Sequence, residues 1–138
     1  MKRGFTLLEL LIVIVIVGTL VTIALPKYQN ALERGRALEG VRNVQYIAEY
    51  VGAKHMATGD WPTEDEMKRL QGTDIVKSRF FGDPKFNSES KKVSISRKGD
   101  WTYSLSATLG EDDAVKNIKC SGKDCKTLDL NVSNLMER

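Results

Sequence analysis

The chain has 138 residues, which is enough for one globular domain and too few for two of ordinary size. Hydrophobic residues make up 41% of the chain and charged residues 28%, a balance typical of folded proteins that excludes disorder throughout. The formal net charge is +3, but Lys2 and Arg3 supply two of these charges at the extreme N-terminus. Net charge therefore gives little support to nucleic-acid binding.

Residues 5–25 form an apolar run with a single charged residue, Glu9. As a helix these 21 residues span about 30 Å, the thickness of the hydrocarbon core of a bilayer. A secretory signal peptide has a shorter apolar region and small residues at its cleavage site, whereas this run ends in Leu25 and Pro26. A plain signal-anchor explains the length and the two preceding basic residues. It does not explain a carboxylate, which costs about 3 kcal/mol near the membrane centre and less near an end.

The stretch KRGFTLLELLIVIVIVGTLVTIALPKYQ, residues 2–29, resembles the class III signal of type IV pilins and type II secretion pseudopilins. The resemblance consists of a short basic leader followed by Gly4, Phe5, Glu9, Gly18 and Pro26 at that family's spacing. It implies that a prepilin peptidase cuts between Gly4 and Phe5, and that the new amine of Phe5 is N-methylated. It also implies that the apolar segment stays in the mature protein, first as an anchor and then in the core of a fibre.

The same resemblance implies three parts and a fold. Residues 1–4 are expected to be a leader peptide, and residues 5–25 a transmembrane helix that becomes the filament core. Residues 26–138 are expected to form a periplasmic or extracellular head that includes the C-terminal half of the long helix. The implied fold is α+β, with one long N-terminal helix packed on a small antiparallel sheet.

Glu9 acquires a physical role in this interpretation. Cleavage creates a positive amine at Phe5, four residues before Glu9, and this spacing puts both groups on one face of a helix, where they can pair within the chain. The resemblance implies instead a pair between neighbouring subunits, in which Glu9 sets the axial register while apolar packing supplies most of the attraction. Either pairing removes much of the cost of burying an unpaired charge. The sequence allows both, as well as a carboxylate that reaches the lipid headgroups without a partner.

Gly18 and Pro26 predict a weak point in the helix. Pro26 removes a backbone donor, and Gly18 lowers helix propensity. The resemblance implies that the helix can loosen between these positions when a fibre extends, whereas the residues alone are equally consistent with a simple kink at the membrane boundary. Thr19 and Thr22 are expected to bond the carbonyls that are freed.

The helix is expected to continue to about Lys54, with its second half packed on a sheet. Its apolar stripe is predicted to consist of Ala31, Leu38, Val41, Val44, Ala48 and Val51. The charged residues, expected to be solvated or to lie between subunits, are Glu33, Arg34, Arg36, Glu39 and Arg42. Thr63 is predicted to cap a short helix that runs to Leu70, with Glu66 at the capping-box position, and Trp61 to hold the preceding loop against the long helix.

Strands are predicted from Thr73 onward. KKVSISRKGDWTYSLSATL alternates apolar and polar residues and indicates a hairpin that turns at KGD. Its inward face is predicted to hold Val93, Ile95, Trp101, Tyr103, Leu105, Ala107 and Leu109. VKNIKCSG indicates a third strand and TDIVKSRFF a weaker fourth, and the tail TLDLNVSNLMER is expected to add an edge strand.

Cys120 and Cys125 enclose the four residues SGKD. Behind an N-terminal export or membrane signal, such a close pair favours a disulfide. Its stabilisation should stay below the roughly 3 kcal/mol estimated for a 15-residue loop, because the closed loop is short. Structural zinc would need two further ligands, and His55 is the only histidine.

The residues that could carry catalysis or bind a metal form no matching pattern. His55 is expected to be a polar residue at the end of the helix, because nothing in the sequence positions a nucleophile beside it. Glu111, Asp112 and Asp113 lack the spacing of a calcium loop and are expected to be solvated. There is no glycine-rich phosphate loop, so the energy for assembly must come from a separate motor ATPase. We expect no catalytic residue, no metal site and no cofactor.

The sequence thus predicts a structural subunit and not an enzyme. By its resemblance it is a type IV pilin-like protein, a single-pass precursor in the bacterial inner membrane that polymerises with its own copies into a helical surface fimbria. Such a fibre serves adhesion, motility or DNA uptake, and its expected partners are prepilin peptidase, the assembly platform and the motor ATPase.

Two alternatives stay open at this stage. One is a type II secretion pseudopilin that forms a periplasmic pseudopilus, and the other is a membrane-anchored binding domain that never polymerises. A minor pilin is a further option, and so is nucleic-acid binding, without other support, through Lys91, Lys92, Arg97 and Lys98.

Overall fold

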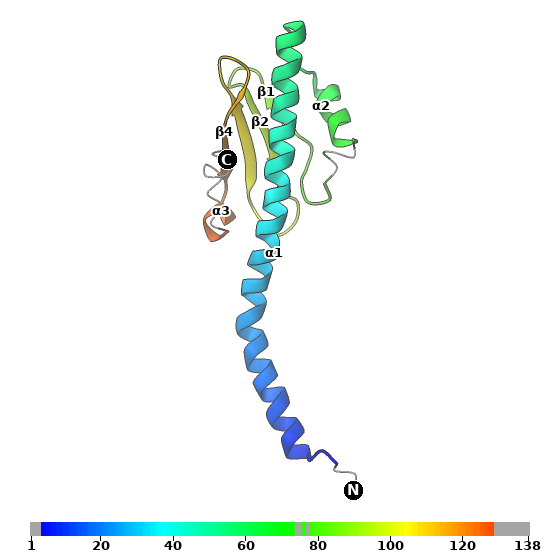
Figure 1. The fold of residues 1–138 in the computed structure, drawn as a ribbon, viewed down its shortest axis with the longest axis vertical. Helices are drawn as coiled ribbons and strands as arrows, with labels where there is room; N and C mark the ends of the chain where they lie inside the picture. Colours follow the sequence, from blue (N-terminus) through cyan, green and yellow to red (C-terminus); the bar gives the residue numbers. More distant parts are fainter. Residues whose placement is uncertain (1–3, 74–75, 77, 129–138) are drawn as a thin grey trace.

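The computed structural model describes residues 4–73, 76 and 78–128. Figure 1 shows one long helix, α1 (Leu7–Thr58), that runs the length of the molecule and carries a small head on its C-terminal half. The head contains α2 (Glu64–Gln71), a four-stranded sheet and the single turn α3 (Asp124–Thr127). The predicted α+β arrangement of a long helix on an antiparallel sheet is confirmed.

The ends of α1 are set by local signals. Thr6 is its N-cap, and Glu9 completes a capping box. Gly59 ends the helix in the left-handed conformation, with φ 77°, and its N–H donates to the carbonyl of His55 at 2.8 Å. The helix therefore extends four residues beyond the predicted end at Lys54, and it runs unbroken through Pro26.

The sheet is an antiparallel meander of four strands in the order β1-β2-β3-β4. Its strands are β1 (Lys85–Asn87), β2 (Lys92–Ser96), β3 (Ser104–Leu109) and β4 (Val115–Ser121). The predicted hairpin is β2–β3, and the third predicted strand is β4. The alternation of apolar and polar residues identified these strands, because their core and solvent faces differ sharply.

Two details of the predicted strands are wrong, and one strand was missed. The turn at KGD is part of a longer connection, because Ser96 pairs with Ser104, so Trp101 and Tyr103 precede β3 instead of lying on it. The described residues of the segment 73–81 form turns and bends, with one isolated bridge from Phe81 to Arg97, and β1 was not predicted. The predicted edge strand in the tail and the leader residues 1–3 lie outside the described residues.

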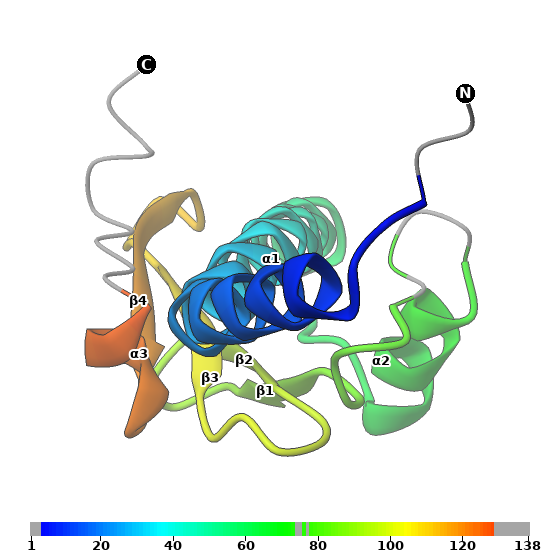
Figure 2. The ribbon, with the colours of Figure 1, turned by 90° about the horizontal axis from the view of Figure 1, so that it is seen from below.

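The core lies between one face of α1 and one face of the sheet (Figure 2). Of the predicted helix stripe, Val41, Val44, Ala48 and Val51 are buried, but Ala31 and Leu38 are exposed. The buried face is rotated toward small residues, and it also includes Glu33, Ala37, Gly40, Ile47 and Gly52. Glycine at 40 lets the sheet side approach closely, because a Cβ there would lie 2.3 Å from Cζ of Phe81.

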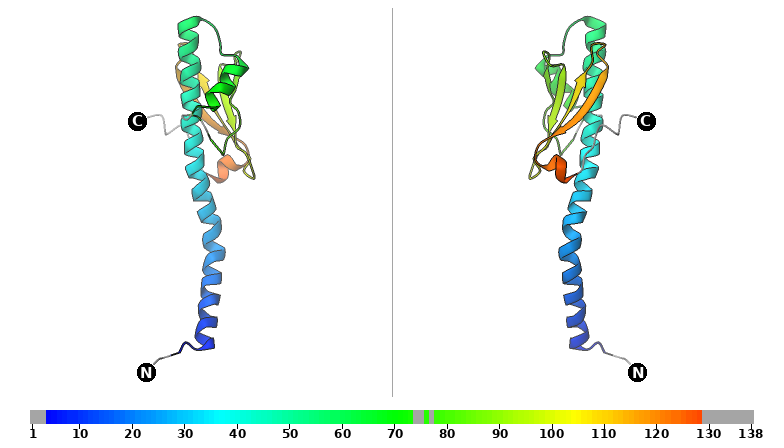
Figure 3. Two further views of the ribbon diagram at one scale, coloured as in Figure 1. Left: turned by 90° about the vertical axis from the view of Figure 1, so that its right-hand side faces the viewer. Right: turned by 90° about the vertical axis from the view of Figure 1, so that its left-hand side faces the viewer.

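The N-terminal half of α1 makes no contact with the head (Figure 3). Large apolar side chains from Phe5 to Tyr28 are all at least 48% exposed. The helix is long and apolar enough to cross a membrane, and none of its most apolar window is buried inside the protein. A protein in water would not leave a surface of this size uncovered.

Candidate functional site

The N-terminal end of α1 is built around Thr6 and Glu9. The Thr6 side-chain oxygen accepts the N–H of Glu9 at 3.2 Å, and the Glu9 carboxylate accepts from the N–H and the hydroxyl of Thr6 at 3.5 and 3.4 Å. The carboxylate also lies at the positive end of the helix dipole. Glu9 thus has a local partner in Thr6, which was not predicted although the T-x-x-E spacing is visible in the sequence.

The predicted cleavage position lies just before this cap. Gly4 precedes the helix, and no atom lies within 4 Å of the place a Cβ would occupy there. Phe5 is 80% exposed. The peptide bond between Gly4 and Phe5 therefore lies outside the helix, beside an exposed aromatic side chain.

Gly18 and Pro26 both lie inside α1. Thr19 and Thr22 donate their hydroxyls to the carbonyls of Ile16 and Thr19, at 2.8 and 2.7 Å. The carbonyl that Pro26 leaves without its helical donor is that of Thr22, four residues earlier. The expectation that the two threonine hydroxyls bond freed carbonyls is therefore wrong for this position.

A buried carboxylate fastens the head to α1. Glu33 is 0% exposed, and Arg97 binds it through two nitrogens, Nε to Oε1 at 2.5 Å and Nη2 to Oε2 at 2.9 Å. The hydroxyl of Tyr103 donates to Oε1 at 2.8 Å, and Nη1 of Arg36 donates to Oε2 at 3.1 Å. Glu33 is thus not on a solvated face, as the sequence suggested, because its partner comes from the β2–β3 hairpin, 64 residues away.

The electrostatics of this cluster favour full ionisation. Burial raises the pKa of Glu33, but hydrogen bonds from Arg97, Tyr103 and Arg36 outweigh burial, and the net shift is downward. The same carboxylate raises the pKa of Arg97. Burial and then the hydrogen bond to Glu33 raise the pKa of Tyr103, which stays a neutral donor. The arrangement is a bidentate ion pair completed by a phenol.

A second cluster joins the end of α1 to the β3–β4 loop. Nδ1 of His55 lies 2.5 Å from Oδ2 of Asp113, and Nζ of Lys91 lies 3.0 Å from Oδ1 of the same carboxylate. The His55 ring stacks on Trp61, with centroids 3.7 Å apart, and Trp61 also contacts Phe86. The hydrogen bond from His55 and then that from Lys91 lower the pKa of Asp113.

This cluster corrects two expectations. His55 is not merely a polar residue at a helix end, and Asp113, which is 7% exposed, is not a solvated loop residue. Lys91 and Arg97, two of the four residues considered for nucleic-acid binding, are both engaged in ion pairs within the head. Trp61 holds its loop against α1, as the sequence predicted.

Comparison with known proteins adds an independent finding. Residues 1–25 match the family described as the prokaryotic N-terminal methylation motif. The N-terminus of this chain is therefore similar to that of proteins that carry the methylation motif. A fimbrial protein of Neisseria meningitidis serogroup A is 31% identical over 58% of this chain and 47% of its own length. The type IV major pilin protein PilE of Neisseria gonorrhoeae is 31% identical over 58% of this chain and 48% of its own length.

A fimbrial protein of Pseudomonas aeruginosa is 29% identical over 80% of this chain and 70% of its own length. The chain thus spans about half the length of the two Neisseria relatives and more of the Pseudomonas one. No solved structure matches it. The similarity to pilins therefore rests on the N-terminal motif, on these relatives and on the helix-and-sheet arrangement.

The head contains the disulfide Cys120–Cys125, with Cα atoms 5.9 Å apart. It joins β4 to α3. The carboxylate of Asp124 accepts the N–H of Thr102 at 2.6 Å, and Nε of Arg34 donates to the carbonyl of Leu128 at 2.7 Å. The disulfide loop is thereby tied both to the β2–β3 connection and to α1.

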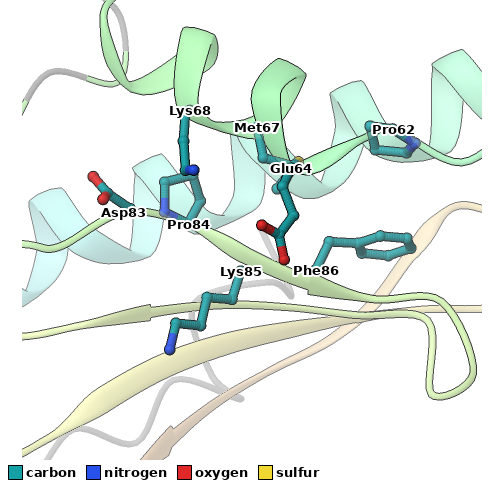
Figure 4. Close-up of a pocket in the computed structure, with 8 residues that line it drawn as sticks. All are labelled: Pro62, Glu64, Met67, Lys68, Asp83, Pro84, Lys85 and Phe86. Atoms are coloured by element: carbon teal, nitrogen blue, oxygen red, sulfur yellow. The ribbon is translucent and has the colours of Figure 1, made fainter.

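A pocket of 360 Å³ lies between α2 and β1 (Figure 4). Its lining residues are Pro62, Glu64, Met67, Lys68, Asp83, Pro84, Lys85 and Phe86. This lining offers no serine, cysteine or histidine that could act as a nucleophile with its base. Within the described residues, no group of three or more His, Cys, Asp and Glu side chains is placed to hold a metal ion.

Proposed function

We propose that this chain is the structural subunit of a type IV pilus. The observation that carries the proposal is the methylation motif at the start of an apolar helix whose N-terminal half is exposed on every side. Similarity to a major pilin and to fimbrial proteins supports it. The exposed surface fits a membrane first and a bundle of neighbouring helices afterwards, because both environments remove apolar side chains from water.

The division of the chain follows from this proposal. Residues 1–4 are the leader, cut between Gly4 and Phe5 by a prepilin peptidase, and the Phe5 amine is then methylated. Residues 5–25 hold the single-pass precursor in the bacterial inner membrane and later form the filament core. Residues 26–138 form the head, which lies outside the inner membrane. Gly18 and Pro26 mark the segment where the helix loosens.

Glu9 changes partners in this scheme. In the precursor its carboxylate caps its own helix through Thr6. Cleavage creates a new positive amine at Phe5, one residue before that cap. Inside a packed filament an unpaired carboxylate is strongly unfavourable, so Glu9 pairs with the Phe5 amine of a neighbouring subunit and fixes the axial register.

The partners follow the same scheme. The chain forms a helical homopolymer, and an assembly platform driven by a motor ATPase supplies the work of extraction from the membrane. The filament serves adhesion, motility or DNA uptake at the cell surface. A secretion pseudopilus in the periplasm is the competing outcome, and the pilin and fimbrial names of the relatives favour the surface filament.

Filaments sheared from the native cells and analysed by mass spectrometry test the proposal. We expect a subunit that begins at N-methylated Phe5. A subunit that begins at Met1, or its absence from surface filaments in cells that make the protein, would overturn the pilus assignment. The same filaments recovered only from the periplasm would assign the chain to a pseudopilus.

The role of Glu9 is tested with Glu9→Ala and a matched control, Glu49→Ala, which removes an exposed carboxylate from the same helix. Glu9→Ala should be cleaved and inserted normally, while filament yield falls more than about tenfold, because a buried amine loses its partner. The control should assemble at the wild-type level. Normal yield from Glu9→Ala would contradict the pairing.

A further inference from the structure

The head begins, on the side of the apolar half of α1, at the level of Glu33, which is the first residue of α1 that is buried. Two other segments reach this level. Arg97, at the start of the β2–β3 connection, binds Glu33, and the carbonyl of Leu128, after α3, accepts from Nε of Arg34 at 2.7 Å. Figure 3 shows α3 and the β2–β3 connection at the same end of the head. We call residues 27–36, 97–103 and 121–128 the proximal end.

The proximal end is strongly basic. Its basic residues outnumber its acidic ones seven to three, an excess larger than the net charge of the whole chain, +3. Five of the cations have exposed side chains, and these are Lys27, Arg34, Lys98, Lys123 and Lys126. None of the four lysines among them forms an ion pair with a described residue. Their charges are therefore available to an external anion.

The opposite end of the head is acidic. There the β3–β4 loop meets the end of α1, as the contact between His55 and Asp113 shows, and α2 begins. The carboxylates of this acidic end are Asp60, Glu64, Asp65, Glu66, Glu89, Glu111, Asp112 and Asp113. Two of them pair with lysines, and the other six form no ion pair with a described residue. The charges of the head are thus separated along α1, with the positive end toward the apolar half of the helix.

The proximal end lies close to a bilayer when residues 5–25 span it. From Leu25 to Arg34 the helix rises about 14 Å, at 1.5 Å per residue. The headgroup layer occupies roughly 5 to 7 Å beyond the hydrocarbon core. The proximal end is then within about 10 Å of the headgroups, which is about one Debye length at 0.1 M salt. Lys27, two residues after Leu25, lies in the headgroup layer itself.

We propose that the proximal end binds anionic phospholipid headgroups and holds the head upright on the inner membrane before assembly. The inference rests on the proposed membrane-spanning role of residues 5–25. Lysine and arginine side chains near an anionic bilayer are attracted to it, and the attraction adds up over the residues that lie within a Debye length. The separated charges also orient the head, because the same surface repels the acidic end.

The acidic end of a second copy is the other surface with complementary charge. Copies anchored in one membrane carry their heads at the same height, because the head is fixed to α1 and α1 is fixed in the bilayer. Basic ends then stand beside basic ends, and acidic ends beside acidic ends. Charge pairing between heads is therefore disfavoured before assembly, and the observations favour the lipid surface as the partner.

The two tryptophans report on the two ends of the head. Trp101 belongs to the proximal end, whereas Trp61 stacks on His55 near the acidic end. The full chain carrying Trp61→Phe is reconstituted in phosphatidylcholine vesicles, with or without phosphatidylglycerol, that contain a lipid with a nitroxide on its headgroup. Quenching of Trp101 should be at least about twofold stronger in the anionic vesicles, because the head is drawn to the surface. The difference should disappear between about 0.1 and 1 M salt, where the Debye length falls from about 10 to 3 Å.

Two triple variants locate the effect. Lys98→Gln, Lys123→Gln, Lys126→Gln removes three charges from the proximal end and should abolish the dependence on phosphatidylglycerol. The control Lys85→Gln, Lys92→Gln, Lys116→Gln makes the same change in net charge at exposed positions of the sheet and should keep the dependence. Thermal unfolding shows whether each variant keeps its fold.

Equal quenching of Trp101 in neutral and anionic vesicles, or equal losses in both triple variants, would overturn the inference. Quenching that changes when the protein is diluted in lipid, and not with lipid charge, would assign the proximal end to contact with a second copy. Alkaline extraction of the vesicles separates the two proposals. A chain that is extracted contradicts the membrane-spanning segment and this inference with it, whereas a chain that stays inserted without responding to lipid charge overturns this inference alone.

Discussion

At the scale of single residues, Glu33 is the charge on which the attachment of the head to α1 depends most. We predict that Glu33→Gln destabilises the head by about 3 to 5 kcal/mol, because Arg97 keeps its charge in a site where its side chain is only 6% exposed. Urea unfolding of the full chain in detergent, followed by the fluorescence of Trp61 and Trp101, measures the change. Tyr103→Phe, which removes one hydrogen bond to the same carboxylate, should cost about 1 kcal/mol. A loss for Glu33→Gln no larger than that of the tyrosine variant would contradict the argument.

A second prediction at this scale concerns acid. The hydrogen bond from Lys54 lowers the pKa of Glu66 from 4.5 to about 2. A group whose pKa is lower in the folded state contributes stability above its unfolded pKa and loses it as the pH falls toward the folded one. The contribution of Glu66 should therefore disappear between pH 4.5 and about 2, and that of Asp113 should fall in the same direction below its ordinary value of 3.8.

Urea midpoints measured across this acidic range check the prediction. The loss of stability on acidification should be smaller in Glu66→Gln than in the wild type. Asp60→Asn changes an exposed carboxylate that forms no ion pair with the described residues, and it should keep the wild-type pH profile. An unchanged profile in Glu66→Gln would refute the assignment.

At the residue scale, the sequence could predict contacts between residues that lie close together along the chain, but not contacts between distant residues. The capping box of Thr63 and Glu66 was predicted because its two members lie three residues apart and the hydrogen bonds follow from helix geometry. The pairs Glu33–Arg97 and His55–Asp113 join residues 64 and 58 positions apart. Neither the charge of Glu33 nor its place on a helix indicates a buried partner, because charged residues are seldom buried and no local pattern identifies the partner.

At the scale of elements, the small residues of α1 set its distance from the sheet. A Cβ at Gly52 would lie 2.0 Å from the carbonyl oxygen of Asp113, whereas nothing lies within 4 Å of one at Gly35. We predict that Gly52→Ala destabilises the head by about 1 to 3 kcal/mol, because the loop backbone must move. Gly35→Ala should stabilise it by up to about 1 kcal/mol, because alanine favours the helix. Melting temperatures of the two variants should shift in opposite directions, and a shift of the same sign would be evidence against the packing argument.

Small residues on the buried face of α1 explain why the predicted helix stripe was partly wrong. Sequence periodicity weights large apolar residues such as Leu38, and it therefore placed the buried face around them. In the structure that face is centred on Ala37, Gly40 and Ile47, and Leu38 remains 44% exposed. Close packing of the helix on the sheet favours small residues, which hydrophobicity scales rank low.

The hairpin β2–β3 was predicted because side chains alternate on a strand whatever their size. Strand β1 has only three residues, which are too few for a recognisable pattern.

At the scale of the whole molecule, the chain combines two parts with opposite demands on their surroundings. The apolar half of α1 needs a membrane or neighbouring copies, since its large side chains are exposed along their length. The head has its own core, and the first residue of α1 buried in it is Glu33. The two parts share a single helix, so the position of the head relative to the membrane follows directly from the axis of α1 (Figure 1).

This division predicts that the head folds without the exposed helix. A chain beginning at Gln29 keeps every buried residue of α1 and loses the apolar surface that precedes it. We expect it to be monomeric without detergent in analytical ultracentrifugation, and to unfold in urea with the midpoint of the full chain. A matched chain that begins at Gly40 also lacks Glu33 and Ala37, and so it loses the carboxylate that binds Arg97 and part of the buried face of α1. It should be unfolded, because the lost ion pair and lost core contacts remove a large part of the marginal stability of a small domain. Aggregation of the chain that begins at Gln29, or a folded chain that begins at Gly40, would show that the core of the head is not bounded at Glu33.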